Sequence, residues 1–149
     1  MDAHRKVTIR RAAAGDLPAI AAIQAGSPEA AHWDPADYLN HDCRVAAIGS
    51  TIRSTHGRVA GFLVTRQVGP GEREILNLAV EPSERRTGLA RRLLGEALAS
   101  ENCTWFLEVR ASNAAAIHLY ESAGFERVGR RPDYYHDPAE DGIVMRLFS

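Results

Sequence analysis

The stretch that decides the fold reads Leu78-Ala-Val80, then Glu81-Pro-Ser-Glu-Arg-Arg-Thr-Gly88, then Leu89-Ala90. Residues 74–80 have the apolar character of a strand, whereas proline, serine and glycine in residues 81–88 cannot continue one. Beyond the glycine, apolar residues recur with helical spacing at Leu89, Leu93, Leu94, Ala97 and Leu98. The sequence therefore predicts a strand, a glycine-containing turn and a helix in direct succession.

Such a turn suits an anion. Free N–H groups and the helix dipole favour negative charge at a helix start. Gly88 allows the backbone to approach a ligand closely, and the small Ala90 allows the same. Positive charge surrounds the turn, at Arg85, Arg86, Arg91 and Arg92. An ordinary strand-to-helix connection with solvated arginines accounts for the same residues. A nucleoside-triphosphate P-loop does not, because that motif needs a lysine after its second glycine and the only lysine is Lys6.

The rest of the chain predicts a mixed α/β sheet in one domain, residues 1–149, without repeats or linkers. Asp16 is expected to cap a helix that has Pro18 in its first turn, and Asn113 to cap a later helix that Gly124 ends. A short helix is expected from Asp34 to about Asn40. Strands are expected at residues 7–11, 44–48, 59–68, 74–80, 105–109, 125–129 and 142–147.

A second group of polar residues lies in the strand and helix after residue 105. Glu108 stands in an apolar strand on the face opposite Leu107 and Val109, where a carboxylate can take a proton from an attacking ammonium. Tyr120, with an ordinary pKa of about 10, can donate a proton to a leaving thiolate. A solvent-facing glutamate and a core tyrosine fit the same pattern. His118 is expected to be an exposed helix residue.

Bulk composition narrows the function. The net charge of -1 argues against nucleic-acid binding, which needs a basic surface. No apolar run is long enough for a membrane span or a signal peptide, so we expect a cytoplasmic protein. Cys43 and Cys103 lack metal-ligand spacing and are expected to be buried thiols. We expect no metal.

Together these residues resemble the GNAT superfamily of acetyltransferases. Its phosphate-loop pattern, Gln/Arg-x-x-Gly-x-Gly/Ala, is matched by Arg85-Arg-Thr-Gly-Leu-Ala90. A downstream pattern is matched by Asn113-x-x-Ala116-x-x-Leu119-Tyr120-x-x-x-Gly124-Phe125. The resemblance implies a single-domain α/β fold with a largely antiparallel sheet flanked by helices, and acetyl-CoA as the acetyl donor.

The resemblance is closest to the RimI type, the ribosomal-protein-alanine N-acetyltransferases. Asn77-Leu-Ala-Val80, Leu107-Glu-Val-Arg-Ala-Ser-Asn113 and Tyr134-Tyr135 look like that type, whereas Gly142 stands where the type usually has alanine. It implies Glu108 as the general base and Tyr120 as the proton donor. The implied acetyl-CoA contacts are Leu78, Ala79, Val80, Arg85, Arg86, Thr87, Gly88, Leu89, Ala90 and Asn113.

The acceptor is the least determined part of this interpretation. By resemblance we expect the N-terminal α-amine of a ribosomal protein that begins with alanine, in a slot lined by Trp33, Tyr134 and Tyr135. Four acids without an interspersed Lys or Arg would attract a basic segment: Asp133, Asp137, Glu140 and Asp141. A solvated acidic loop fits equally well. The alternatives are acetylation of lysine side chains, polyamines or a small-molecule amine, and a non-catalytic acetyl-CoA-binding module.

Overall fold

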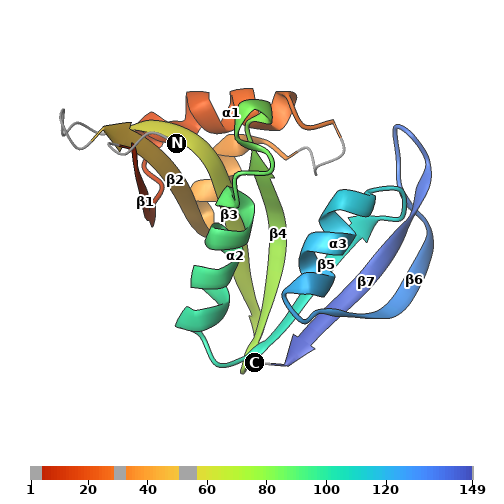
Figure 1. Cartoon of the computed structure of the whole chain (residues 1–149). Helices are drawn as coiled ribbons and strands as arrows, with labels where there is room; N and C mark the ends of the chain where they lie inside the picture. The colour runs from red at the N-terminus through yellow and green to blue at the C-terminus, as the bar shows by residue number, and fades with distance from the viewer. Residues whose placement is uncertain (1–4, 29–32, 51–56, 149) are drawn as a thin grey trace. The chain divides into compact units, whose positions relative to one another are not determined.

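The computed structural model describes residues 5–28, 33–50 and 57–148 of the chain (Figure 1). Its strands are β1 (Arg5–Arg11), β2 (Asp42–Ser50), β3 (Arg58–Gly69), β4 (Glu72–Val80), β5 (Thr104–Arg110), β6 (Glu126–Tyr135) and β7 (Glu140–Phe148). Its α-helices are α1 (Leu17–Ala25), α2 (Leu89–Ser100) and α3 (Ala114–Ser122). Three short 3₁₀ helices are η1 (Ala14–Asp16), η2 (Pro35–Asn40) and η3 (Pro82–Glu84).

The strands hydrogen-bond in the order β1-β2-β3-β4-β5-β7-β6. The pairs β1–β2, β2–β3, β5–β7 and β6–β7 are antiparallel. Strands β4 and β5 are parallel over the pairs from Glu72↔Thr104 to Ile75↔Leu107. A parallel pair needs a crossover connection, and α2 provides it. The prediction of a mixed, largely antiparallel sheet is confirmed.

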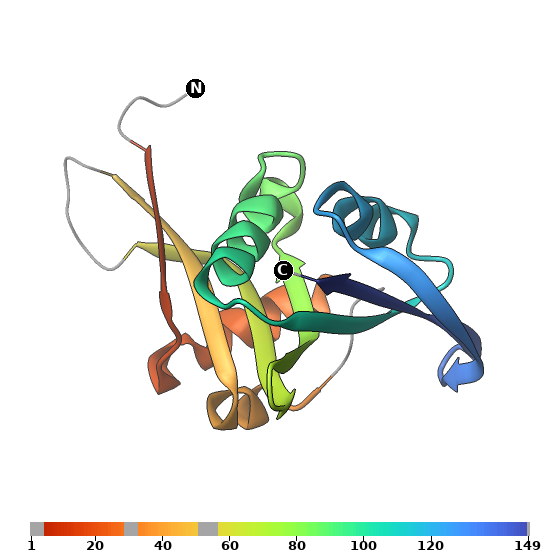
Figure 2. The same cartoon turned by 90° about the horizontal axis from the view of Figure 1, so that it is seen from below.

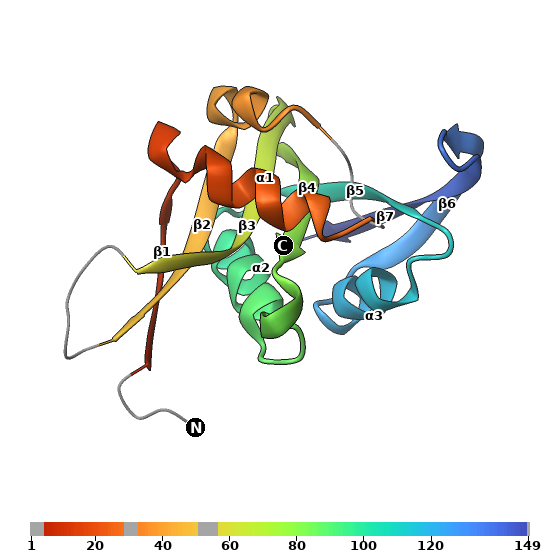
Figure 3. The same cartoon turned by 90° about the horizontal axis from the view of Figure 1, so that it is seen from above.

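The chain divides into two compact units. Unit 1 comprises residues 1–65 and 77–94, and unit 2 comprises residues 66–76 and 95–149. In unit 1, Phe62 of β3 packs against the ring of Tyr38 in η2, with ring centroids 5.6 Å apart. The neighbouring Gly61 faces the other way, because successive strand residues point to opposite faces. A Cβ there would lie 2.8 Å from Val80 and 3.2 Å from Leu93 of α2, so glycine allows this helix to approach the strand (Figure 3).

A buried polar cluster joins α1, η2 and β4 within unit 1. The Tyr38 hydroxyl donates to Oε1 of Gln24 at 2.5 Å, and Nδ2 of Asn77 donates to the Tyr38 oxygen at 3.0 Å. Nε2 of Gln24 donates to the carbonyl oxygen of Trp33 at 2.6 Å. Burial raises the pKa of Tyr38 to about 12, so the hydroxyl keeps the proton that it donates. The cluster fixes the backbone at Trp33, whose side chain is 44% exposed.

In unit 2, α3 lies against one face of β5, β7 and β6 (Figure 2). Trp105, Leu107 and Val109 of β5 are buried and alternate with the half-exposed residues Phe106 and Glu108. This alternation confirms that Glu108 lies on the face opposite Leu107 and Val109.

Two local predictions need correction, and a third is confirmed. Asp16 precedes α1, but its carboxylate forms a two-pronged ion pair with Arg10 (2.8 and 2.9 Å) and accepts the Ala13 N–H, instead of capping α1. A paired guanidinium is a stronger partner than a helix N–H. The short helix expected from Asp34 to about Asn40 is confirmed as the 3₁₀ helix η2, with Asp34 as its cap. Strand β6 extends to Tyr135 rather than Gly129, because a register shift between Arg131 and Tyr135 absorbs the intervening proline.

Among the described residues, no helix combines the length and the apolar character that crossing a bilayer requires. Cys43 and Cys103 are free and buried, as predicted. Burial raises the pKa of the Cys43 thiol to about 12.

Candidate active site

The turn between β4 and α2 has the backbone that an anion site requires. Arg86 and Gly88 have φ values of 67° and 86°, and alternating right- and left-handed backbone turns N–H groups toward one side. The first backbone bond of α2 runs from Arg92 N to Gly88 O, at 3.0 Å. The N–H groups of residues 89–91 therefore precede the helix's own hydrogen bonding. No heavy atom lies within 4 Å of the place that a Gly88 Cβ would take, apart from its chain neighbours.

Glu84 holds this turn from the inside. The side chain of Glu84 is buried and lies 3.2 Å from the guanidinium of Arg58. Its backbone carbonyl accepts the Thr87 hydroxyl at 2.6 Å. These contacts tie the turn to the rest of unit 1, and a turn held in one conformation loses less entropy when a ligand binds.

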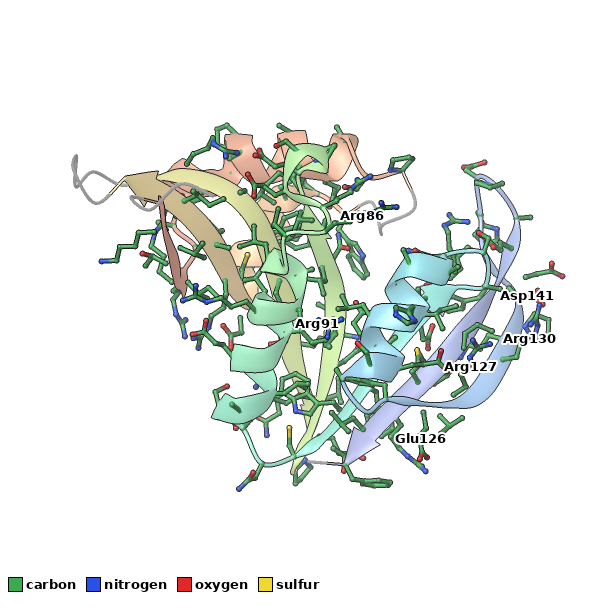
Figure 4. The ribbon with its side chains drawn as sticks, viewed as in Figure 1. Arg86, Arg91, Glu126, Arg127, Arg130 and Asp141 are labelled. Atoms are coloured by element: carbon green, nitrogen blue, oxygen red, sulfur yellow. The ribbon has the colours of Figure 1, made fainter. Side chains whose placement is uncertain are left out.

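The arginines around the turn differ in role. Arg85 donates to the carbonyl of Gly26 at 3.1 Å and to the Ser27 hydroxyl at 3.2 Å, so it anchors the turn to the end of α1. Arg86 lies exposed on the turn, and Arg91 on the first turn of α2 (Figure 4). Both partners of Arg85 are neutral, so its guanidinium keeps its charge beside the turn. That the four arginines provide positive charge to a ligand stays a prediction.

The strand before the turn contains three of the predicted acetyl-CoA contacts, Leu78, Ala79 and Val80. Ala79 and Val80 are buried, whereas Leu78 is half-buried. The N–H of Leu78 donates to Oδ1 of Asn77 at 3.0 Å, and the N–H of Glu81 donates to the carbonyl of Ala60 at 2.8 Å. The Leu78 N–H is thus occupied by the Asn77 side chain.

Glu108 has two carboxylate oxygens in different surroundings. Oε1 lies 3.4 Å from Nε of Arg131, a residue of β6. Oε2 is buried and has no hydrogen-bond partner among the described residues. Tyr134 also interacts with this carboxylate, and its hydrogen bond to Glu108 raises the pKa of Tyr134. A buried carboxylate oxygen without a partner is costly.

Two tyrosines cover the end of β7 in unit 2. Tyr134 and Tyr135 pack edge to face, with ring centroids 5.0 Å apart. The guanidinium of Arg110 lies 4.6 Å from the Tyr135 ring centroid. Both tyrosines sit close to Gly142 of β7, where a Cβ would be 3.1 Å from Cδ2 of Tyr134 and 3.3 Å from Cε2 of Tyr135. The structure thus brings together the predicted residues Glu108, Tyr134 and Tyr135, whereas Trp33 belongs to unit 1.

Asn113 precedes α3, and Tyr120 lies in its last turn. Oδ1 of Asn113 accepts the N–H of Ala116 at 3.1 Å, which confirms Asn113 as the helix cap. Tyr120 is 6% exposed and packs edge to face on Phe125, with ring centroids 5.6 Å apart. Burial raises the pKa of Tyr120. The hydroxyl is therefore a hydrogen-bond donor across the neutral pH range. His118 is exposed, as predicted.

The predicted acidic cluster is largely neutralised by its own unit. Glu140 accepts the N–H of Ser112 at 2.6 Å and lies 3.4 Å from Arg110. Asp141 pairs with Nε of Arg130 at 2.6 Å, side by side in Figure 4. These contacts lower the pKa of both carboxyl groups. The hypothesis of four acids free to attract a basic segment therefore fails for Glu140 and Asp141.

Arg131 is the residue of this region that the sequence did not reveal. The strand predicted from the sequence covers residues 125–129 only. In the structure β6 continues, and its register pairs Arg131 with Gly142. A signal was present in the three arginines Arg127, Arg130 and Arg131, but their spacing alone does not indicate which one faces Glu108.

Comparison with known proteins agrees with the predicted resemblance. The Acetyltransferase (GNAT) family matches residues 17–125, and the chain belongs to that family. Within it, the chain is 48% identical over 99 residues to the ribosomal protein bS18-alanine N-acetyltransferase of Escherichia coli (strain K12), covering 62% of this chain and 66% of that protein. The curated relatives are thus matched over less than two thirds of their length, 28% and 66% for two of them.

Solved structures agree over nearly the whole chain. The crystal structure of the ribosomal-protein-S18-alanine N-acetyltransferase from Escherichia coli has a TM-score of 0.77 and 33% identity, covering 96% of this chain and 94% of that one. The structure of Ard1 from Thermoplasma volcanium has a TM-score of 0.83 and 26% identity, covering 95% and 97%. The GNAT fold prediction is therefore confirmed.

Proposed function

We propose that this protein is an N-acetyltransferase that moves the acetyl group of acetyl-CoA to the N-terminal α-amine of a ribosomal protein that begins with alanine. The solved and curated relatives from Escherichia coli are named for that reaction. The observation that carries the proposal is Glu108, a half-buried carboxylate whose Oε2 atom is buried and unpartnered among the described residues. Such an oxygen is suited to accept a proton from an amine, directly or through a water.

The turn of residues 85–90 fits the diphosphate of acetyl-CoA. Its positive-φ backbone at Arg86 and Gly88 and its open space outside Gly88 leave room for phosphate oxygens near the amides. Arg86 and Arg91 are exposed and can add charge. Acetyl-CoA supplies the activated thioester. The chain supplies the anion site, the base and, in Tyr120, a protonated phenol.

An α-amine is the acceptor that this chemistry favours. A terminal amine with a pKa of about 7.7–8.0 is roughly one tenth neutral at pH 7, whereas a lysine with a pKa of about 10.4 is almost fully charged. Only the neutral amine attacks a thioester. An α-amine therefore needs less help from a base than a lysine side chain does, and one carboxylate is sufficient for it.

The test uses acetyl-CoA and a basic peptide that begins with alanine. The peptide is offered with a free or a blocked terminus, and with its lysines kept or replaced by arginine. Intact mass should show one acetyl group on the free, lysine-less peptide and none on the blocked one. Acetylation that persists on the blocked, lysine-containing peptide and is absent from the free, lysine-less one would assign the alternative, a lysine acetyltransferase. Binding of acetyl-CoA without thioester cleavage, whether or not an amine is present, would indicate a non-catalytic binding module.

The role of Glu108 is tested by Glu108→Gln. We expect turnover to fall by roughly 10²-fold or more, the usual scale for general-base catalysis, with little change in acetyl-CoA affinity measured by calorimetry. A glutamine keeps the shape but accepts no proton. Normal turnover of this variant at neutral pH would remove Glu108 from the mechanism.

A further inference from the structure

The face of unit 2 that carries Glu108 also carries an arginine from the outer strand of the sheet. Glu108 pairs with Val144, and Arg110 pairs with Gly142, across β5 and β7. Arg131 pairs with the same Gly142 across β7 and β6. Paired residues point to the same face of a sheet. Because residue 142 is a glycine, β7 has no side chain at this position between Arg131 of β6 and Arg110 of β5.

Arg131 uses this space to reach the carboxylate. Its Nε atom lies 3.4 Å from Oε1 of Glu108, and its guanidinium carbon lies 5.2 Å from the ring centroid of Tyr134. Tyr134 in turn hydrogen-bonds to Glu108. The arginine, the tyrosine and the glutamate each contact the other two, which restricts the rotation of the Glu108 side chain.

From this geometry we propose that Arg131 is a positioning residue for Glu108: it holds Oε1, so that Oε2 is the oxygen left to accept the proton of the amine. The proposal rests on the proposed function, in which Glu108 is the general base. It assigns different tasks to the two oxygens. Oε1 is occupied by the protein, and Oε2 is buried and unpartnered within the described part of the chain.

Gly142 makes this arrangement possible. An alanine at this position would bring its Cβ to 3.1 Å from Cδ2 and 3.3 Å from Cβ of Tyr134. Contacts of this kind force the ring to shift by a few tenths of an ångström. The Tyr134 ring would then move relative to both Arg131 and Glu108, and the hold on Oε1 would loosen.

The stability of the fold depends little on Arg131. Its side chain is 57% exposed, and exposed ion pairs contribute about 0–1 kcal/mol to the free energy of unfolding. A functional loss on substitution would therefore report on catalysis rather than on folding. Arg130 is a matched control, since it is the neighbouring arginine of β6, is 60% exposed, and pairs with Asp141 instead of Glu108 (Figure 4).

The experiment compares Arg131→Met, Arg130→Met and Gly142→Ala, each assayed with acetyl-CoA and the lysine-less alanine peptide. We expect Arg131→Met to lower kcat between about 10-fold and 10²-fold, the loss that misplacing a catalytic group by about 1 Å produces. The KM for acetyl-CoA and the Tm should stay unchanged. Gly142→Ala should lower kcat by a smaller factor, and Arg130→Met should leave it within about twofold.

A double-mutant cycle separates positioning from other effects. In a Glu108→Gln background, Arg131→Met should have almost no further effect on kcat, because the group that it positions no longer acts as a base. A low kcat of the Glu108→Gln variant together with a normal kcat of the Arg131→Met variant would overturn this inference and leave the proposed function intact. If Arg131→Met lowered kcat by the same factor in the wild-type protein and in the Glu108→Gln background, the inference would also be overturned. A normal kcat of the Glu108→Gln variant would instead overturn the proposed function.

Discussion

At the scale of single residues, burial decides what each group can do. Tyr120 is buried on Phe125, and its pKa is raised. A thiol such as that of cysteine has a pKa of about 8.5, whereas the phenol of an ordinary tyrosine has a pKa of about 10. Complete transfer of the Tyr120 proton to a leaving thiolate is therefore uphill. Tyr120 is better suited to stabilise the developing thiolate through a hydrogen bond.

Replacing Tyr120 with phenylalanine removes this donor and keeps the ring. We expect kcat to fall by about 10²-fold, the loss seen when one donor to a developing anion is removed, with acetyl-CoA affinity unchanged. Because the pKa of Tyr120 is raised, no loss of wild-type activity up to about pH 10 should stem from its ionisation. Phe125→Leu, which alters the packing of the same ring, is the control. Full activity of Tyr120→Phe would exclude the hydroxyl from the reaction.

At the scale of elements, the turn before α2 depends on one backbone conformation. Gly88 has φ 86° and open space around its missing side chain. Gly88→Val should therefore strain the turn by about 1–3 kcal/mol and place a branched side chain where phosphate oxygens would bind. We expect calorimetry to show no acetyl-CoA binding while circular dichroism shows a folded protein.

Gly95, in the helix that follows the turn, offers a matched control. It lies inside α2 without a positive φ, and no heavy atom stands within 4 Å of its missing Cβ. Gly95→Ala should bind acetyl-CoA normally and raise the free energy of unfolding by about 0.5–1 kcal/mol, since alanine favours a helix over glycine. Unchanged affinity in folded Gly88→Val would move the anion site away from this turn.

The junction of β1 and α1 makes a prediction about stability. The pair with Arg10 lowers the pKa of Asp16. A carboxyl group with a lowered pKa in the folded state contributes stability above its unfolded pKa of about 3.9, and this contribution is lost as the pH falls through the folded value. Asp16→Asn should therefore cost about 2 kcal/mol of unfolding free energy at pH 7 and less at pH 3.

Urea unfolding at both pH values measures this difference. Asp42→Asn is the control, because Asp42 forms a looser, more exposed pair with Arg44 at 3.3 Å. Asp42→Asn should lower the free energy of unfolding by no more than about 1 kcal/mol. An equal cost of Asp16→Asn at pH 3 and pH 7 would show that the ion pair does not stabilise the fold.

The elements differ in how far the sequence could predict them. The turn of residues 85–90 was predictable because glycine, proline and helical periodicity are local signals. The extent of β6 was not, because its continuation past the proline depends on pairing with β7 and on a register shift. The role of Arg131 was hidden for the same reason. Glu108 was identifiable from alternation, but the different surroundings of its two oxygens arise from β6, far along the chain.

At the scale of the whole molecule, charge is spread rather than concentrated. The net charge is -1, and Glu140 and Asp141 are paired with arginines of their own unit. A long-range field that attracts basic peptides is therefore weak. We therefore expect the acceptor to be selected by short-range contacts between its terminal residues and the neighbouring side chains of Glu108, Tyr134 and Tyr135.

This argument predicts a small effect of salt on acceptor binding. Between about 0.05 and 0.5 M salt the Debye length falls from about 14 Å to about 4 Å, which would suppress any steering by surface charge. We expect the KM of the basic alanine peptide to change by less than about threefold over this range, and the KM of a neutral alanine peptide to change equally little. The measurement is initial rates for both peptides at matched pH. A KM that rises about tenfold for the basic peptide alone would show that Asp133 and Asp137 form an attracting surface despite the pairing of Glu140 and Asp141. In that case Asp133→Asn with Asp137→Asn should abolish the difference between the two peptides.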